Sequence, residues 1–301
     1  MATALTIGNF DGVHRGHRSL LDKSREVVGA QGEVHALFFD PHPAIFFQRG
    51  NTPLQPKDLL TSTQRRSELL QSFGADVVDR RAFDSEFAAQ SPEAFVEAVV
   101  VKAHRADHVV VGPDFRFGAK AAGDVETLVA LGQRHGFEVD TVDAVLEGGA
   151  VISSTRIRAL IREGRVADAS ALLARFHDVD ARVVQGDQRG RTIGFPTANL
   201  DGIQGLIPAD GVYAVRATVA GTEHGGMANI GTRPTFAAGR SVEVHLFDFD
   251  ADIYGADVRV AFLARLRGET KFNGVEALVA QLRQDETKAR ELLARGAKPW
   301  T

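Results

Sequence analysis

The sequence of 301 residues has no cysteine, no large excess of charge of either sign and no long apolar run. Without cysteine there is neither a disulfide framework nor a thiolate zinc site, which fits a reducing compartment. The 35 basic and 39 acidic residues nearly balance, so we expect no nucleic-acid partner. No apolar run approaches the ~20 residues that span a bilayer, and the first residues do not resemble a signal peptide. We therefore expect a cytoplasmic protein with no membrane partner.

Length and composition indicate two ordinary globular domains. Apolar residues make up 44% and charged residues 25% of the chain, as in folded globular proteins. A chain of this length exceeds one typical core. The pattern changes around residues 165–185, and we place the boundary between Ala174 and Ala181. The prediction is one domain over residues 1–178 and a second over residues 179–301.

The first half alternates buried strands with amphipathic helices. Strands are predicted at residues 4–8, 33–39, 107–112 and 137–143. Helices are predicted from His17 to Gly29, from Ser91 through Val100, and from Asp124 to Gly136, with Ser91 and Asp124 as N-caps. This order favours an α/β domain whose parallel sheet is covered on both faces.

The second half consists of closely spaced strands followed by one helix. Several segments alternate apolar and polar residues, for example Val242, Val244 and Leu246. Turns that contain Gly or Asp separate them. These features predict a small antiparallel sheet or barrel, closed by an amphipathic helix from about Val275 to Leu293.

The most informative local motif is Gly-Asn-Phe-Asp-Gly-Val-His-Arg-Gly-His, residues 8–17, between the first strand and the first helix. Ligands of open α/β sheets bind at this end of a strand. His14 and His17 are three residues apart and share a helix face. Gly16 lets a phosphate approach the backbone, and a helix N-terminus offers free N–H groups. The motif predicts a polyphosphate site; a two-histidine metal pair and a glycine-rich turn with incidental histidines remain alternatives.

A second polar cluster, Ile-Ser-Ser-Thr-Arg-Ile-Arg at residues 152–158, stands where another helix is expected to begin. Its hydroxyl groups and arginines could form a second phosphate cradle. Capping of the helix would explain Ser154 or Thr155 but would leave the arginines without a role.

The third cluster runs from Val184 to Asn199 and is rich in glycine and arginine. Gly186, Gly190 and Gly194 permit a backbone that wraps around phosphate oxygens. The spacing is not that of a Walker A loop, and on glycine content alone a surface loop is the more ordinary reading. Thr197 and Asn199, however, place two oxygen ligands on one face of an extended segment, an arrangement that suits Mg²⁺ bridging to ATP.

The N-terminal motifs resemble a known superfamily. The HxGH pattern followed by ISSTxIR resembles the Rossmann-like nucleotidyltransferases, and most of all the FMN adenylyltransferase module of bacterial bifunctional FAD synthetases. FDPHP at 39–43, VGPDFRFG at 111–118 and Gly123-Asp124 fit the same family. The resemblance implies that His14 and His17 act on the ATP phosphates. It further implies an ATP and phosphate site at Gly8, Phe10, Asp11, Gly16, Ser154, Thr155 and Arg158, and a flavin or nucleotide pocket at Asp114, Phe115 and Phe117.

The C-terminal motif GRxxGFPTAN resembles the riboflavin kinase signature. PADGVYAV at 208–215, NIGTRPTF at 229–236, VEVHLFDFD at 242–250 and LRGETKF at 266–272 fit that family. The resemblance implies a six-stranded antiparallel barrel with a C-terminal helix. It also implies Glu243 as the catalytic base, Thr197 and Asn199 as metal ligands, and a phosphate site at Gly186, Gly190, Arg191, Gly194 and Pro196.

Together the motifs predict a bifunctional enzyme that uses ATP and Mg²⁺. Riboflavin would become FMN in the second domain, and FMN would become FAD in the first, in a monomer or weak homo-oligomer. Three alternatives remain: one domain is inactive, the first domain adenylylates another substrate such as a pantetheine or nicotinamide nucleotide, or the chain is a flavin-binding sensor or carrier. The riboflavin kinase motif argues against the second alternative, while HxGH and Glu243 argue against the third.

Overall fold

The structure is a computed structural model that describes residues 1–48, 53–186, 189–232 and 240–295. Contacts divide the chain into two compact units. The N-terminal unit comprises residues 1–55 and 63–153, and the C-terminal unit comprises residues 56–62 and 154–301. No helix in the described ranges is both long and apolar enough to cross a membrane.

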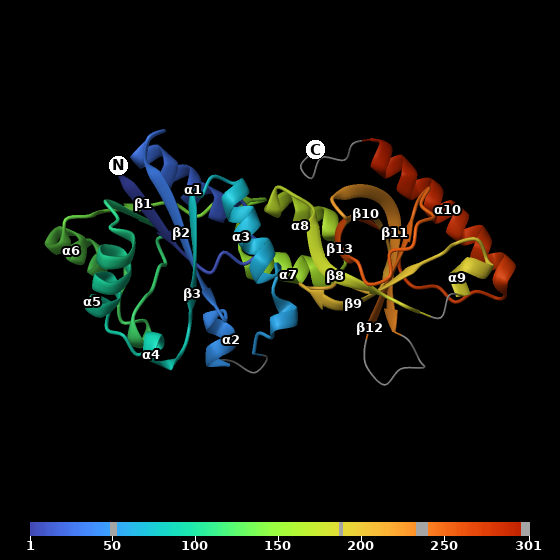
Figure 1. Cartoon of the computed structure of the whole chain (residues 1–301), viewed down its shortest axis with the longest axis horizontal. Helices are drawn as coiled ribbons and strands as arrows, with labels where there is room; N and C mark the ends of the chain where they lie inside the picture. The colour runs from blue at the N-terminus through green and yellow to red at the C-terminus, as the bar shows by residue number, and fades with distance from the viewer. Residues whose placement is uncertain (49–52, 187–188, 233–239, 296–301) are drawn as a thin grey trace. The chain divides into compact units, whose positions relative to one another are not determined.

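The N-terminal unit is built on a five-stranded parallel sheet with the order β3-β2-β1-β4-β5 (Figure 1). Its strands are β1 (Thr3–Ile7), β2 (Glu33–Asp40), β3 (Val77–Ala82), β4 (His108–Val111) and β5 (Glu138–Thr141). The strand order reverses between β1 and β4, and ligands of such sheets bind beyond the carboxyl ends of the strands at that point. The predicted parallel α/β sheet is confirmed. The edge strand β3 was not predicted, because it has only half-buried and exposed residues and lacks a buried apolar run.

Helices cover both faces of this sheet, and each face has its own apolar core. The described helices are α1 (Arg15–Val28), α2 (Pro43–Phe47), α3 (Thr63–Ser72), α4 (Ser85–Ala88), α5 (Pro92–Phe95), η2 (Val96–His104), η3 (Ala119–Ala121) and α6 (Val125–His135). One core joins α1 and α3 to Val34, Ala36 and Phe38 of β2. The other joins η2 and α6 to Leu5 and Ile7 of β1. Alternate residues along a strand point to opposite faces, so each strand supplies both cores.

The helix boundaries follow the capping residues expected from the sequence. Ser91 and Asp124 accept hydrogen bonds from backbone N–H groups as the N-caps of α5 and α6. Gly136, with φ of 83°, ends α6 in the left-handed region that favours glycine. The first helix begins at Arg15, two residues before the predicted His17, because His14 is its N-cap.

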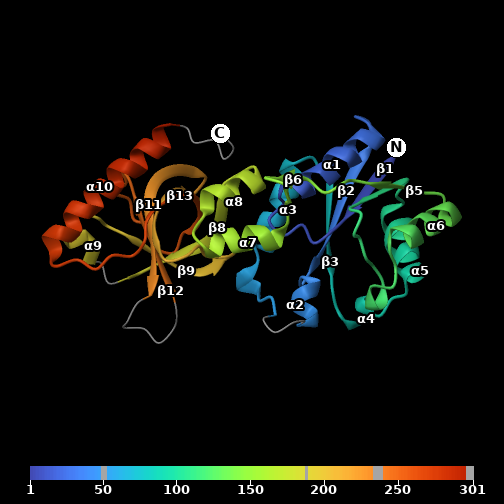
Figure 2. The ribbon, with the colours of Figure 1, turned by 180° about the vertical axis from the view of Figure 1, so that it is seen from behind.

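The C-terminal unit is a closed six-stranded barrel with the order β10-β11-β12-β9-β8-β13 (Figure 2). All of its pairings are antiparallel. Its strands are β8 (His177–Val184), β9 (Ala198–Gln204), β10 (Gly211–Val219), β11 (Thr222–Thr232), β12 (Arg240–Leu246) and β13 (Asp257–Arg267). The helix α10 (Val275–Ala294) packs on β10, β11 and β13. The predicted barrel with a C-terminal helix is confirmed.

Four shorter elements complete the description of this part of the chain. They are η1 (Pro56–Asp58), α7 (Ser154–Arg162), α8 (Val166–Leu173) and α9 (Arg189–Thr192). By their contacts α7 and α8 belong to the C-terminal unit, since the division falls after Ser153. A two-stranded hairpin, β6 (Leu146–Glu147) and β7 (Ala150–Val151), precedes that division. The predicted domain boundary between residues 178 and 179 stays a prediction.

Candidate active sites

The two motif histidines cap the first helix of the N-terminal unit reciprocally. The backbone N–H of His17 donates to Nδ1 of His14, and the backbone N–H of His14 donates to Nδ1 of His17, each at 3.3 Å. The two rings stack with centroids 3.6 Å apart. Reciprocal bonds of this kind satisfy two of the free N–H groups at a helix start. The HxGH spacing therefore fixes both ring orientations as well as the helix boundary.

These bonds also determine the tautomer of both histidines. An imidazole nitrogen that accepts a hydrogen bond carries no proton, so the neutral ring must carry its proton on Nε2. Both rings thus keep an Nε2–H donor that the cap does not use. Burial lowers the pKa of His17 well below its ordinary value, and the neighbouring charges of His14 and Arg66 lower it further. His17 is therefore neutral at neutral pH, and its Nε2–H is available as a hydrogen-bond donor that is not positively charged.

The loop before the helix is folded tightly under these rings. Phe10, Gly12 and Val13 have φ of 48°, 83° and 39°, a region that is costly for a β-branched residue such as valine. The side chains of Phe10 and Asp11 are buried, so they anchor the loop in the interior of the unit. Their predicted part in ATP binding stays a prediction.

A cavity of about 460 Å³ lies at the carboxyl end of the sheet in the N-terminal unit. Phenylalanine is the most frequent residue of its lining: Phe39, Phe47, Phe83, Phe87, Phe95, Phe115 and Phe117, with Gly8, Asp114 and Lys120 among the other lining residues. Phe115 and Phe117 are stacked with centroids 5.5 Å apart. A Cβ on Gly123 would lie 2.8 Å from the Phe117 ring, so glycine is required beside it. The cavity is suited to a flat aromatic ligand.

The structure places Asp114, Phe115 and Phe117, which the sequence assigned to a flavin or nucleotide pocket, in one cavity with Gly8, which it assigned to the ATP site. The part of these residues in binding stays a prediction. Five further aromatic residues of the lining (Phe39, Phe47, Phe83, Phe87 and Phe95) were not predicted as site residues, because isolated phenylalanines carry no local signal of a site. Ser154, Thr155 and Arg158 lie in the first turns of α7, so the predicted helix start is confirmed. Since α7 clusters with the C-terminal unit, a shared site with His14 and His17 stays a prediction.

In the barrel, strand pairing aligns the predicted catalytic acid with two amides. Glu243 of β12 stands opposite Asn199 of β9 and Asn229 of β11. Directly opposed residues of antiparallel strands share a face, so all three lie on one face. Val242 and Val244, on the other face of β12, are buried. Thr197 Oγ1 donates to Glu243 Oε2 at 3.3 Å. Glu243, Thr197 and Asn199 are therefore neighbours, while Asn229 was not predicted.

Two glycines of the same motif make room for the predicted metal ligands. A Cβ on Gly186 would lie 1.9 Å from the Asn199 side-chain nitrogen. A Cβ on Gly190 would lie 2.2 Å from the carbonyl oxygen of Phe195 and 3.4 Å from Thr197 Oγ1. Glycine at these positions lets the loop pack directly against Asn199 and the segment around Thr197. Around Gly194, which has φ of 84°, no atom lies within 4 Å of the Cβ position.

Gly190→Ala is expected to lower riboflavin phosphorylation by about 10²-fold in kcat/KM, because the methyl group must displace Phe195 and the Thr197 beside it. Gly194→Ala is the matched control. It meets no neighbouring atom and adds about 1–2 kcal/mol of backbone strain. Steady-state kinetics of both variants test this. Equal losses in the two would contradict the steric argument, because Gly194→Ala displaces no neighbouring atom.

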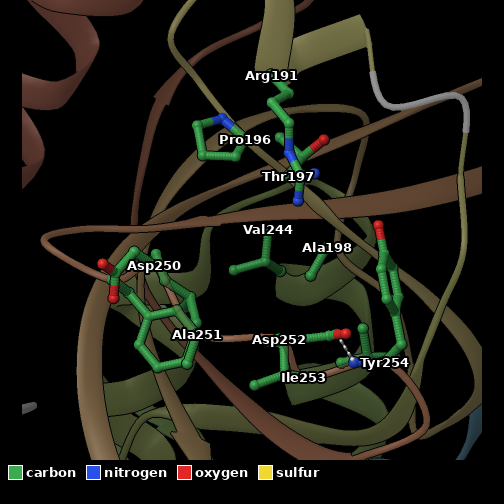
Figure 3. Close-up of a pocket in the computed structure, with 13 residues that line it drawn as sticks. Arg191, Pro196, Thr197, Ala198, Val244, Asp250, Ala251, Asp252, Ile253 and Tyr254 are labelled. Atoms are coloured by element: carbon green, nitrogen blue, oxygen red, sulfur yellow. Dashed lines mark hydrogen bonds between the residues drawn. The ribbon is translucent and has the colours of Figure 1, made fainter.

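Two cavities of the C-terminal unit have Thr197 in common. One, of about 400 Å³, is lined by Arg191, Pro196, Thr197, Val244 and the segment 250–254. Figure 3 shows Arg191, Pro196 and Thr197 along one side of it and the 250–254 segment along another. The other, of about 370 Å³, is lined by residues of the barrel and α10, among them Phe195, Met227, Glu243, Arg267, Phe272 and Leu282. Thr197 thus lines both cavities, and its partner Glu243 lines the second.

Neighbouring side chains hold this arrangement in place. His245, two residues after Glu243, bonds through Nδ1 to the Pro196 carbonyl at 2.7 Å, which requires the proton on Nδ1. Arg267 donates to the buried Asp285 of α10 at 2.8 Å. The structure places Gly190 at the second cavity and Arg191 and Pro196 at the first. Residues 233–236 of the NIGTRPTF segment lie outside the described residues.

Thr197, Asn199 and Glu243 offer a hydroxyl, an amide and a carboxylate oxygen. Hard oxygen donors of this kind suit Mg²⁺, which binds through few protein ligands together with phosphate oxygens and water. Glycines at 186 and 190 leave the ligand side chains room beside the loop. The donor set therefore fits a magnesium ion carried by a nucleotide.

The fold and sites are those of a two-unit transferase: a parallel-sheet unit whose first helix begins at a histidine-capped loop, and a barrel unit with a carboxylate beside a hydroxyl and an amide. The sequence pattern of FAD synthetase matches residues 1–156, and that of riboflavin kinase matches residues 173–293. The chain belongs to the family of bifunctional riboflavin kinase/FMN adenylyltransferases.

Relatives match over nearly the whole chain. The bifunctional riboflavin kinase/FMN adenylyltransferase of Escherichia coli K12 is 40% identical over 290 residues, covering 95% of this chain and 91% of that protein. The protein of the same name from Listeria monocytogenes is 39% identical, covering 97% and 92%. A solved structure from Streptococcus pneumoniae, described as a macrolide-efflux protein, has a TM-score of 0.86 and 34% identity, covering 96% and 94%.

Proposed function

We propose that this chain makes FAD in two steps, each in one unit. In the C-terminal unit, riboflavin and ATP give FMN and ADP. In the N-terminal unit, FMN and a second ATP give FAD and pyrophosphate. The proposal rests on the family to which the chain belongs and on the fit of two separate sites to the two reactions. The proposed setting is the cytoplasm, with small-molecule substrates and a monomer or weak homo-oligomer.

In the C-terminal unit, Glu243 is the proposed general base. The largely apolar cavity beside it, with Phe195, Phe272 and Met227, suits the isoalloxazine ring of riboflavin. Glu243 would accept the proton of the 5′-hydroxyl as that oxygen attacks the γ-phosphorus of ATP. The bond from the γ-phosphorus to the bridging oxygen of ADP breaks. The cavity with Arg191 is the proposed nucleotide site, and Thr197 stands where the two substrates would meet.

Thr197 and Asn199 are the proposed protein ligands of Mg²⁺ in this unit. The bound ion would neutralise phosphate charge during phosphoryl transfer. The chain itself supplies Arg191 near the phosphates and the loop with Gly186, Gly190 and Gly194 around them. The Thr197 hydroxyl also holds the Glu243 carboxylate at 3.3 Å, which keeps the base beside the phosphate site.

In the N-terminal unit, catalysis requires positioning and charge stabilisation. The FMN phosphate is already an anion at neutral pH, so no base is needed. Its oxygen would attack the α-phosphorus of ATP, and the bond to the pyrophosphate oxygen breaks. His14 and His17 would donate their Nε2–H groups to phosphate oxygens, together with the N–H groups at the start of α1. Ser154, Thr155 and Arg158 are proposed as ATP-binding residues, and the aromatic cavity is proposed to take the flavin.

The observation that carries the proposal is the pairing of Glu243 with Thr197 where the barrel's two cavities adjoin. The test is to incubate the purified chain with riboflavin, ATP and Mg²⁺ and to separate the three flavins by chromatography. We expect FMN to appear first and FAD to follow. FMN without FAD would contradict the N-terminal part of the proposal. Bound but unconverted riboflavin would contradict the C-terminal part, and a failure to convert supplied FMN to FAD as well would favour a flavin carrier.

A further inference from the structure

The largest fully buried side chain of the described residues belongs to Arg66 of α3. It is 1% exposed and lies under the loop that carries the motif histidines. Its Nη1 donates to the carbonyl oxygen of Asn9 at 3.1 Å, and its Nη2 lies 3.7 Å from Oδ1 of Asp11. The guanidinium also lies over the Phe38 ring, 5.0 Å from its centroid. Arg66 is therefore inaccessible to a substrate but touches the loop directly.

A buried Arg–Asp pair is weak evidence for a stabilising role. Removing two charges from water is costly, and apolar residues of similar volume often replace such pairs without loss of stability. Arg66 stands at a core position of α3, on the same helix face as the buried Leu69 and Leu70. Fold stability alone would favour an apolar residue there. The position of Arg66 is better explained by what it does to the loop.

Arg66 contacts the loop on both sides of its first left-handed residue. Asn9 and Asp11 flank Phe10, whose φ is 48°. Strained conformations of this kind persist only where the surrounding structure determines them fully. The bond to Asn9 and the ion pair with Asp11 fix the direction in which the chain leaves β1. They thereby set the position of His14, the N-cap of α1.

Arg66 also acts on the protonation of the cap. The charged or titratable groups around the His17 ring are His14 from its own helix and Arg66 from α3, with Asp11 next to Arg66. Together with burial, the charges of His14 and Arg66 lower the pKa of His17. Protonation at Nδ1 would remove the acceptor of the His14 backbone N–H. The Arg66 charge acts in the same direction as burial, the largest cause, and disfavours the protonation of His17 that would break this bond.

We propose that Arg66 is a positioning residue for adenylyl transfer, which holds the loop of residues 9–14 in the geometry that presents His14 and His17 to the ATP phosphates. This inference rests on the proposed function of the N-terminal unit. It assigns a role in that reaction to a residue that never touches the substrate. The two proposals fail differently: a native chain that makes no FAD from FMN and ATP contradicts the function, whereas active Arg66 variants contradict only this inference.

The test uses the full chain with Arg66→Gln, Arg66→Lys and Asp11→Asn. FAD formation from supplied FMN and ATP is measured across mildly acidic to alkaline pH, and the His17 pKa is followed by NMR. Arg66→Gln should lower kcat/KM by about 10²-fold, mainly through kcat. It should also raise the His17 pKa and so shift the acid limb of the pH–rate profile to higher pH. Arg66→Lys should regain part of the rate with a His17 pKa near the native value.

Asp11→Asn separates a positioning role from a merely structural one. It removes the ion pair but leaves the Arg66 charge, so the rate should fall while the His17 pKa stays at or below its native value. Riboflavin phosphorylation by the same chain serves as the internal control and should not change in any variant. An Arg66→Gln chain with native kcat and a native pH profile would overturn the proposal. So would equal upward shifts of the His17 pKa in Arg66→Gln and Asp11→Asn.

Discussion

Glu243→Gln is expected to lower the riboflavin kinase rate by about 10²- to 10⁴-fold, the usual contribution of a general base. Glutamine keeps the volume of the side chain and can still accept the hydrogen bond from Thr197. It has no carboxylate to accept the proton of the riboflavin 5′-hydroxyl. The loss should therefore fall on kcat, with a small change in KM for riboflavin. Initial rates of FMN formation at saturating ATP measure both constants.

Two controls accompany this variant. FAD formation from supplied FMN should stay at its native rate, because that reaction is proposed for the other unit. Glu269→Gln removes a second carboxylate that lines the same cavity and should cost much less than Glu243→Gln. Similar losses in the two variants would mean that the negative charge of the cavity matters and that Glu243 is not the base.

His17→Asn is expected to lower the rate of FAD formation by about 10²- to 10³-fold, the range seen on losing one donor to a developing oxyanion. Asn places an oxygen near the position of Nδ1, so it can still accept the bond from the His14 backbone N–H. It has no group at the position of Nε2. The variant thus keeps the helix cap and removes only the proposed donor. Single-turnover rates with FMN and ATP measure the effect on the chemical step.

His17→Gln is the matched control. Glutamine at the third helical position can accept the His14 backbone N–H, as in a capping box, and its amide also supplies an N–H near the position of Nε2. A lost cap costs about 1 kcal/mol of stability, which thermal unfolding detects. We expect both variants to keep nearly native stability and His17→Asn to be the less active one. Equal losses of activity in two stable variants would contradict the donor role of His17.

The sequence predicted those elements whose signals are local. Ser91, Asp124 and Gly136 bound their helices as expected, since capping depends on a few consecutive residues. The strand β3 and the helix α3 were not predicted. Residues 77–82 form a half-exposed edge strand without the continuous apolar pattern of the central strands. In α3, the arginine at a core position interrupts the apolar pattern that would have marked the helix.

The candidate sites also differ in whether their residues are contiguous in the sequence. The motifs that contain His14, His17, Thr197 and Asn199 are contiguous, so their spacing alone indicates phosphate and metal chemistry. The aromatic cavity draws residues from several separate segments of the N-terminal unit, and no local pattern joins them. A charged residue at an apolar position was the one available signal for Arg66.

By itself, the sequence determined the family, the order of the two units and the residue types that handle phosphate, because these reside in short contiguous motifs. Only the tertiary structure decided which groups meet. It placed Asn229 beside Glu243 through strand register, fixed the proton of His17 on Nε2 through a backbone bond, and put the Arg66 charge beneath the loop. Strand register and the position of the buried Arg66 charge depend on contacts between residues far apart along the chain. The tautomer of His17 depends on the exact geometry of the folded loop. The order of the residues alone specifies neither.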